Sequence, residues 1–313
     1  MDFTLTTYQT LLLELKRQQF SFQTFHEYME RPTQPLYYSQ ARENASLSSL
    51  EWKDQPTNVF VCESSPLGDK GARASKDKTI ILRHDVDKLP ENSLLFAQIQ
   101  HELGIKGSYY FRMVPESFNI EIIGEIARLG HEIGYHYEDI DFASKSIKYQ
   151  VSSIKIKEET EKVLAEKAIV FFEKHLTQLR KYYPVKTICM HGSPLSKYDN
   201  KLIWKYYNYR DYGIIGEPYF DVDFSNVLYL TDTGRRWDGE RVSIRDKIKD
   251  KSEKIKVKKT QDIIQAANNG KLPYQIMFTF HPQRWTHKPF PWVKELVLQN
   301  VKNLMKYGLN RLK

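Results

Sequence analysis

The stretch TIILRHDVD, residues 79–87, decides the fold class, because an apolar run of strand length ends abruptly in charged residues. Residues 91–103 then show helical character and stop at Gly104, a residue that commonly ends helices. The segment KGSYYFR, residues 106–112, has the aromatic character of another strand. A strand, a helix and a second strand in this order predict parallel strands joined by a right-handed crossover.

The same alternation continues on both sides of this unit. Helical patterns are expected at residues 7–18, 120–129, 144–182 and 291–307, and strands at residues 20–25, 132–136, 186–190, 213–215, 227–230 and 275–280. Roughly six to eight strand–helix units favour a distorted or incomplete (β/α) barrel over an open doubly wound sheet. No glycine-rich phosphate loop follows any predicted strand, which counts against a nucleotide-binding fold.

The chain length fits one α/β-barrel catalytic domain that spans residues 1–313. Residues 32–78 are rich in Ser, Pro and Asn and are expected to form a loop-rich excursion. The formal net charge is +8, and a large part of the excess lies in a basic insertion at residues 241–259. Such a run is usually solvated, so nucleic acid is not an expected partner.

The cysteines, the N-terminal pattern and the distribution of apolar residues suggest a cytoplasmic protein. The two cysteines, Cys62 and Cys189, lie far apart and show no metal-binding spacing, as expected in a reducing compartment. The first residues form an amphipathic pattern and not a signal peptide. No stretch of about 18 apolar residues predicts a membrane span. The oligomeric state is not predicted.

Two aspartates directly follow the first apolar run. In an extended chain Asp85 and Asp87 point to the same side. Two such carboxylates can divide the work of a hydrolase, because one can bind a cation while the other takes a proton from a water molecule. The alternative is an ordinary strand-end turn that is capped by aspartates.

Three histidines also lie at the ends of predicted strands. His136, His191 and His281 each follow an apolar run, whereas His131 starts one and is expected to be structural. In a parallel barrel the carboxyl ends of all strands meet at one face. A single histidine there would mean little, but three of them beside Asp85 and Asp87 predict an active site.

The segments IILRHDVD, KGSYYFRM, GHEIGYH and FTFHP resemble the polysaccharide deacetylase superfamily, the NodB-like esterases of the carbohydrate esterase family 4 type. The similarity is good over residues 79–140 and loose elsewhere, as in a divergent branch. The resemblance implies a distorted (β/α) barrel that removes an N- or O-acetyl group from a sugar. The expected setting is surface-polysaccharide biosynthesis, with an acetylated carbohydrate as the partner.

The resemblance also assigns roles to individual residues. Asp85 matches the general base, and Asp87 resembles the metal-binding acid, displaced by one position. His136 matches the first metal-binding histidine. His281 resembles the late histidine that protonates the leaving group. These roles define a catalytic pair, Asp85 and His281, beside a metal site.

Two departures from the family pattern affect this site. The position of the second metal-binding histidine holds Ile140, which cannot bind a metal. His191 is the first choice to replace it, and Glu138 and Asp139 are weaker candidates. The family's Arg-Pro motif is missing as well. Arg83 or Arg112 is expected to pair with Asp85 in its place.

Other residues are candidates for substrate binding or support. Asp232 and Trp237, in LTDTGRRW, loosely resemble the family motif that supports the late histidine. Groups that could face a sugar or simply pack are Tyr109, Tyr135, Arg235, Arg236, Trp237 and Trp285. Residues 14–29 resemble a helix–strand unit that usually lies near the end of such barrels, so this segment is expected to close the barrel.

The resulting hypothesis is a metal-dependent deacetylase. Asp87, His136 and His191 would bind a divalent cation, with Zn²⁺ as the first choice among metals that accept nitrogen and oxygen ligands. Two alternatives stay open at this point. One is a metal-dependent hydrolase of a non-carbohydrate amide, and the other is a barrel that binds sugar without turnover.

Overall fold

The computed structural model describes residues 1–31, 77–147, 156–192, 196–237 and 257–311. The predicted loop-rich excursion and the predicted basic insertion lie almost wholly outside the described residues. Over these residues, no helix is both long and apolar enough to cross a membrane.

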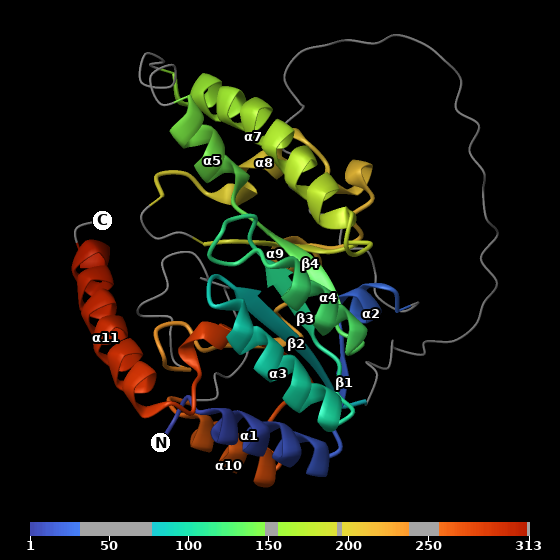
Figure 1. Ribbon diagram of the computed structural model, residues 1–313, viewed down its shortest axis with the longest axis vertical. Coiled ribbons are helices and arrows are strands. Elements are labelled where there is room, and N and C mark those ends of the chain that lie inside the picture. Colours follow the sequence, from blue (N-terminus) through green and yellow to red (C-terminus); the bar gives the residue numbers. More distant parts are fainter. Residues whose placement is uncertain (32–76, 148–155, 193–195, 238–256, 312–313) are drawn as a thin grey trace, which may run out of the picture. The chain divides into compact units, whose positions relative to one another are not determined.

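The centre of the fold is a sheet of seven strands in which every pairing is parallel (Figure 1). The strands are β1 (Ser21–Gln23), β2 (Thr79–Val86), β3 (Ser108–Phe111), β4 (Glu132–Tyr137), β5 (Ile188–Met190), β6 (Leu228–Thr231) and β7 (Gln275–Phe280). Their order is β5-β4-β3-β2-β7-β6, with β1 paired to β2. The predicted α/β class, a sheet of the distorted (β/α)-barrel type, is confirmed.

Helices connect and cover the strands. They are α1 (Leu5–Arg17), α2 (Phe25–Met29), α3 (Pro90–Glu102), α4 (Ile120–Arg128), α5 (Asp139–Ser146), α7 (Lys157–Arg180), α8 (Ile203–Tyr206), α9 (Pro218–Asp221), α10 (Thr260–Asn268) and α11 (Pro289–Arg311). Gly104 and Gly130 follow α3 and α4 with φ of +64° and +89°, the left-handed conformation that favours glycine. These two glycines therefore end both helices where the sequence predicts.

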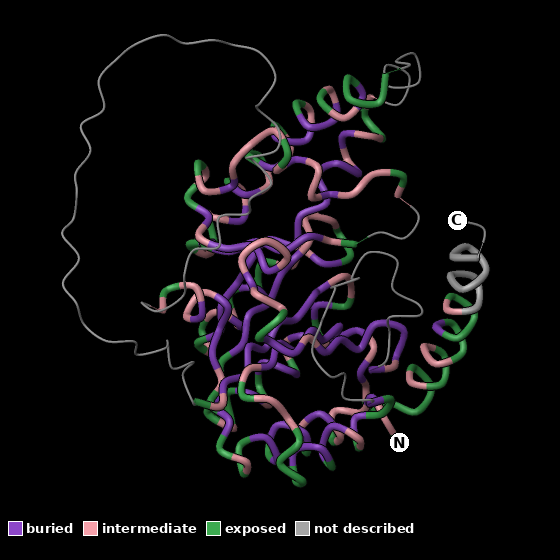
Figure 2. Tube along the Cα trace, turned by 180° about the vertical axis from the view of Figure 1, so that it is seen from behind, coloured by how far each residue is buried: buried purple, intermediate pink, exposed green. Residues whose placement is uncertain are grey.

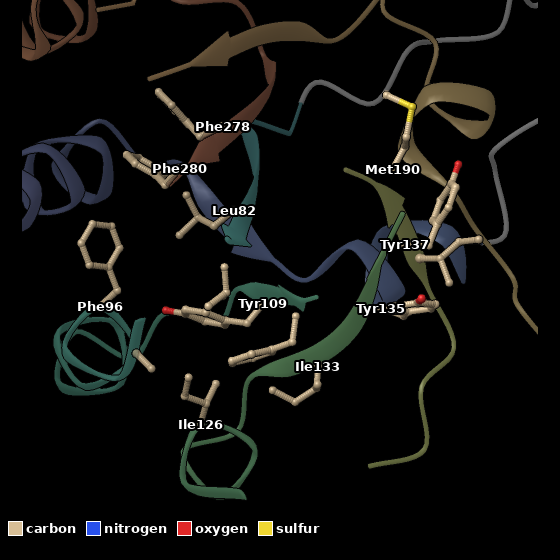
Figure 3. Close-up of a cluster of buried hydrophobic side chains, with 14 of the residues drawn as sticks. Leu82, Phe96, Tyr109, Ile126, Ile133, Tyr135, Tyr137, Met190, Phe278 and Phe280 are labelled. Carbon is tan, nitrogen blue, oxygen red and sulfur yellow. The ribbon is translucent and has the colours of Figure 1, made fainter. Parts of the chain in front are cut away.

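Side chains on the two faces of β2 enter different parts of the core. Leu82 packs with Phe96, Tyr109 and Phe280 between the sheet and its helices, in the cluster drawn in Figure 3. Ile81 lies on the opposite face, in a second cluster that also contains Tyr110, Cys189, Met277, Phe25 and Tyr28. Because strand side chains alternate, Arg83 and Asp85 share the face of Ile81. The strand thus carries both residues toward the inner side of the curved sheet.

Three local predictions need correction. The helix predicted at residues 144–182 is described as α5 and α7, with residues 148–155 between them outside the description. Residues 213–215 form no strand, although neighbouring Gly216 makes an isolated bridge to Thr187. The segment at residues 14–29 does not join the edge strands β5 and β6, because β1 pairs with Thr79–Ile81 of β2.

Candidate active site and metal centre

Four predicted residues meet where β2, β4 and β5 end. The Nε2 atom of His136 lies 3.6 Å from Oδ1 of Asp87 and 3.8 Å from Oδ2 of Asp85. The Nε2 atom of His191 lies 3.7 Å from the same Oδ1 of Asp87. The parallel register brings them together, because β4 lies between β3 and β5 and pairs His136 with Cys189, two residues before His191.

The orientation of His136 is fixed by a backbone carbonyl. Its Nδ1 atom lies 2.9 Å from the carbonyl oxygen of Cys189. Since a carbonyl can only accept, Nδ1 carries a proton, and Nε2 is the nitrogen that faces the two aspartates. A hydrogen bond of this kind is the usual outer support of a metal-binding histidine.

Asp87 presents one free carboxylate oxygen to both imidazoles. Its Oδ2 accepts a hydrogen bond of 2.8 Å from Nε2 of Gln283. Its Oδ1 is buried and has no hydrogen-bond partner among the described residues. Donor atoms that share one tetrahedral zinc ion lie roughly 3.3–3.5 Å apart. The distances of 3.6 and 3.7 Å from this oxygen to the two Nε2 atoms fit such an ion.

Two other groups of side chains in the described part of the chain could also hold a metal. They are Asp85, His136 and Cys189, and Glu138, Asp141 and His191. The carboxylates in both groups already have strong partners. Asp85 is bound by Arg83 through two hydrogen bonds of 2.8 and 2.6 Å. The group of Asp87, His136 and His191 is therefore the best candidate.

The sequence left open whether Arg83 or Arg112 pairs with Asp85, and the structure shows that it is Arg83. Arg83 binds Asp85, and both side chains are buried. Burial acts to raise the pKa of Asp85, but the Arg83 guanidinium outweighs it and the pKa lies below its ordinary value. Arg112 does not pair with Asp85. It binds Glu138 through hydrogen bonds of 2.9 and 2.8 Å and donates to the carbonyl of Asp87 at 3.1 Å.

The carboxylate of Glu138 lies beside the imidazole of His191. Its Oε2 lies 3.2 Å from Nδ1 of His191. Burial would raise the pKa of Glu138, but His191 and Arg112 lower it to about 2. Asp139 lies apart, where it accepts hydrogen bonds from the hydroxyl of Tyr135 and contacts His175 at 2.7 Å. Neither carboxylate is free to replace the missing histidine.

His281 and its supports lie at the ends of β6 and β7. The Nδ1 atom of His281 is 2.6 Å from Oδ1 of Asp232, which leaves Nε2 available. The same carboxylate accepts hydrogen bonds from Arg284 and from the indole of Trp285. Burial acts to raise the pKa of Asp232, but His281 outweighs it, so this carboxylate has a lowered pKa. Gln283 joins this region to Asp87.

Most of the residues that could face a sugar prove to be packed. Trp285, Tyr109 and Tyr135 have no exposed surface, and Trp237 is 4% exposed with its indole donating to Thr260. The sugar-facing alternative is therefore wrong for these four. Trp285 instead supports Asp232. Arg235 is also buried and contacts the ring of Trp292, whereas Arg236 is partly exposed.

The structure adds residues that the sequence did not single out. Gln283 fixes Asp87, and Arg284 donates to Asp232. Asn200 donates to the carbonyl of His191 at 3.0 Å and so supports its loop. Gln283 and Arg284 lie in HPQRW, next to His281, and this proximity was the one available signal. Nothing local points to Asn200.

Comparison with known proteins finds similarity to solved structures. No protein-family model matches the sequence, and no curated protein does so significantly. The chain is similar to solved structures of a CE4 family pseudoenzyme from Bacillus anthracis and of its mutant with restored enzymatic activity, each with a TM-score of 0.36 and 12% identity over 74% of the chain. It spans 62% and 64% of those two proteins. A further match is the Xyl-CE4 domain of a xylanase from the hindgut metagenome of Trinervitermes trinervoides, with a TM-score of 0.33, 12% identity and coverage of 74% of this chain and 85% of that one.

Proposed function

We propose that this chain is a metal-dependent carbohydrate deacetylase, a divergent member of the polysaccharide deacetylase superfamily. It removes an acetyl group from an N- or O-acetylated sugar, in surface-polysaccharide biosynthesis. The observation that carries the proposal is the Oδ1 of Asp87, which has no hydrogen-bond partner in the described part of the chain and faces the Nε2 atoms of His136 and His191. Asp85 and the His281–Asp232 pair lie at the same ends of the strands.

Asp87, His136 and His191 would hold the cation. This donor set of one carboxylate and two imidazoles suits Zn²⁺ and also accepts cobalt, nickel or manganese. When bound, a divalent cation supplies Lewis-acid chemistry to an acetyl carbonyl and acidity to a water molecule. Gln283 and the carbonyl of Cys189 keep the donor atoms in place.

Asp85 and His281 divide the proton transfers. The Arg83 pair keeps Asp85 ionised and fixed, so its carboxylate can take a proton from the attacking water. Asp232 holds Nδ1 of His281 and thereby directs Nε2 toward the leaving group. A protonated His281 can then donate to the departing amine or alcohol, which completes the release of acetate.

The direct test is acetate release from a panel of N-acetylated and O-acetylated oligosaccharides. We expect release from at least one class by the purified chain, loss after treatment with a chelator, and recovery with added Zn²⁺. Release that is indifferent to chelation would contradict the proposal. Tight metal binding without acetate release from any sugar would instead favour a non-carbohydrate amide as substrate. Absence of both metal and activity would favour a sugar-binding barrel without turnover.

A further inference from the structure

The cations around the candidate site differ in how they are held. Arg83, Arg112 and Arg284 each donate to a carboxylate, at distances of 2.6, 2.8 and 3.0 Å. Such pairs neutralise the positive charge and occupy the donor groups. Figure 2 shows the strands of the sheet almost wholly in the colour of buried residues, so groups that meet a substrate have to come from the segments beyond the strand ends. Lys201 lies in one of these segments.

Lys201 is held by an aromatic ring and not by a close carboxylate. Its Nζ atom lies 5.1 Å from the centre of the Tyr219 ring, and its side chain is 29% exposed. In the described part of the chain no residue accepts a hydrogen bond from Nζ, and the carboxylate of Asp199 is 3.9 Å away and itself 42% exposed. An aromatic face holds a cation in place without neutralising it. The N–H groups of this lysine therefore stay available to a ligand.

Two contacts place Lys201 beside the site. Asn200, the preceding residue, donates to the carbonyl of His191 at 3.0 Å. The ring of Tyr219 also lies 5.3 Å from the guanidinium of Arg83, which binds the proposed general base. Lys201 thus follows a residue that supports a proposed metal ligand, and it shares an aromatic ring with the arginine that fixes the base.

The buried carboxylate of Glu217 does not compensate this lysine. Its Oε1 accepts a hydrogen bond from the amide of Met190 at 3.1 Å, and its Oε2 accepts one from the amide of Tyr219 at 2.6 Å. Burial raises the pKa of Glu217 to about 7, although Lys201 is among the cations that act to lower it. Glu217 and Lys201, both described, form no ion pair. The charge of Lys201 therefore remains for a ligand.

We propose that Lys201 forms an anion subsite beside the metal centre, which selects acetylated sugars that carry a negatively charged group. A carboxylate or phosphate on the sugar would accept hydrogen bonds from the ammonium group, and charge-assisted bonds of this kind are roughly twice as strong as neutral ones. The inference rests on the proposed function, because it names the class of sugar on which the deacetylase acts.

The test is titration calorimetry of the full chain after treatment with a chelator, so that no turnover occurs. The probes are a tetrasaccharide of alternating N-acetylglucosamine and glucuronic acid, and chitotetraose as its neutral counterpart. We expect the acidic sugar to bind about fivefold to tenfold more tightly. In Lys201→Gln its affinity should fall to that of chitotetraose, while the affinity for chitotetraose stays unchanged. Lys201→Arg keeps the charge and should keep the preference.

Lys78→Gln is the matched control. The Nζ atom of Lys78 lies 5.4 Å from the centre of the Phe20 ring, so this lysine is also held by an aromatic face. It directly precedes β2 and therefore lies at the other end of that strand from the site. Lys78→Gln should retain the full preference for the acidic sugar.

A second pair of probes identifies the kind of anion. N-acetylglucosamine 1-phosphate is compared with N-acetylglucosamine in the same titration. A preference for the phosphate alone, abolished in Lys201→Gln, would assign the subsite to sugar phosphates. A preference for the glucuronic acid probe alone, abolished in the same variant, would assign it to acidic sugars.

Three results would overturn the proposal. They are the absence of any preference for an anionic probe in the unaltered chain, a preference that persists in Lys201→Gln, and a loss in that variant that is equal for neutral and anionic sugars. Acetate release without an anion preference would remove the subsite alone. An anion preference without acetate release from any sugar would remove the deacetylase and leave the subsite in place.

Discussion

The two ends of β4 carry histidines that are equally buried but differ in their partners. His131 and His136 are each 2% exposed. At the start of the strand, Nδ1 of His131 accepts from the Gly107 amide at 3.2 Å, and Nε2 donates to the Ala97 carbonyl at 2.9 Å. At the end of the strand, Nε2 of His136 lies 3.6 Å from Oδ1 of Asp87 and 3.8 Å from Oδ2 of Asp85. A buried imidazole with both nitrogens bonded to backbone groups is structural, whereas one whose second nitrogen faces carboxylates is placed to share a metal ion with them.

The carboxylates at the two ends differ in the same way. Glu132, at the start of β4, accepts hydrogen bonds from the hydroxyls of Ser108 and Thr187 and from the amide of His26. Asp87, at the opposite end of the sheet, has one buried oxygen that accepts no hydrogen bond from any residue that the structure describes. The hydrogen bonds of Glu132 therefore assign it a supporting role, whereas the lone pairs of this Asp87 oxygen leave it able to bind a cation.

The largest effect is expected when the proposed base is neutralised. Asp85→Asn should lower the rate of acetate release by about 10³-fold, within the range that general base catalysis contributes. Its metal content should stay that of the unaltered chain, because Asp85 is not among the proposed ligands. Kinetics and elemental analysis of the same preparation check both points. Activity within tenfold of the unaltered chain would remove Asp85 from the mechanism.

Removal of His191, the proposed third ligand, should weaken metal binding. His191→Ala is expected to weaken Zn²⁺ binding by about 100-fold or more, because one of three protein donors is lost. His101→Ala, an exposed histidine of α3, is the matched control and should bind as before. Titration calorimetry measures both. An unchanged affinity in His191→Ala would leave the ligand that replaces Ile140 unidentified.

At the other end of β4 the same kind of substitution should affect stability alone. His131→Leu leaves the Gly107 amide and the Ala97 carbonyl without partners, at a cost of about 2–3 kcal/mol in the free energy of unfolding. Metal affinity should not change. Denaturant unfolding measures the free energy of unfolding, and calorimetric titration measures the metal affinity. A loss of metal binding in a folded His131→Leu protein would break the contrast between the two ends.

The cost of His131→Leu should also depend on pH. Burial lowers the pKa of His131 to about 4. The unfolded chain takes up this proton near the ordinary histidine value, so the folded state loses stability as the pH falls from about 6.5 to about 4. His131→Leu lacks this loss. The stability gap between the two proteins should therefore shrink by roughly 2 kcal/mol over that window. A constant gap would show that His131 titrates normally in the fold.

The smallest effect is expected at the residue that orients Asp87. Gln283→Leu removes the hydrogen bond to Oδ2 and should weaken metal binding by about tenfold, as outer-sphere substitutions do. Gln265→Leu, on the exposed side of α10, should leave the affinity unchanged. Calorimetric titration of both variants decides the point. Equal affinities would mean that Asp87 is held in place without Gln283.

The sequence predicts the fold well where local signals are strong. Apolar runs mark β2, β4 and β7, and Gly104 and Gly130 mark the ends of helices. The pairing of β1 with β2 was not predictable in the same way. Residues 21–23 carry no local signal for their partner, which lies more than fifty residues away in the chain. Strand pairing over such a separation depends on the packing of the whole sheet.

For the site, the strand-end rule was sufficient to bring the main residues together. Asp87, His136 and His191 each follow an apolar run in the sequence, and the parallel register places them within reach of one another. The rule could not choose between Arg83 and Arg112 as the partner of Asp85. That choice depends on which face of its strand each arginine occupies and on how far its side chain reaches.

The central claim is that one cation is shared by three strand ends. A crystal structure of the chain grown with Zn²⁺, with anomalous data at the zinc edge, tests it most directly. We predict a single strong peak about 2.0–2.2 Å from Oδ1 of Asp87 and from the Nε2 atoms of His136 and His191. A peak that forms at other residues, or a site where Oδ1 of Asp87 bonds to a protein donor and no metal binds, would contradict the claim.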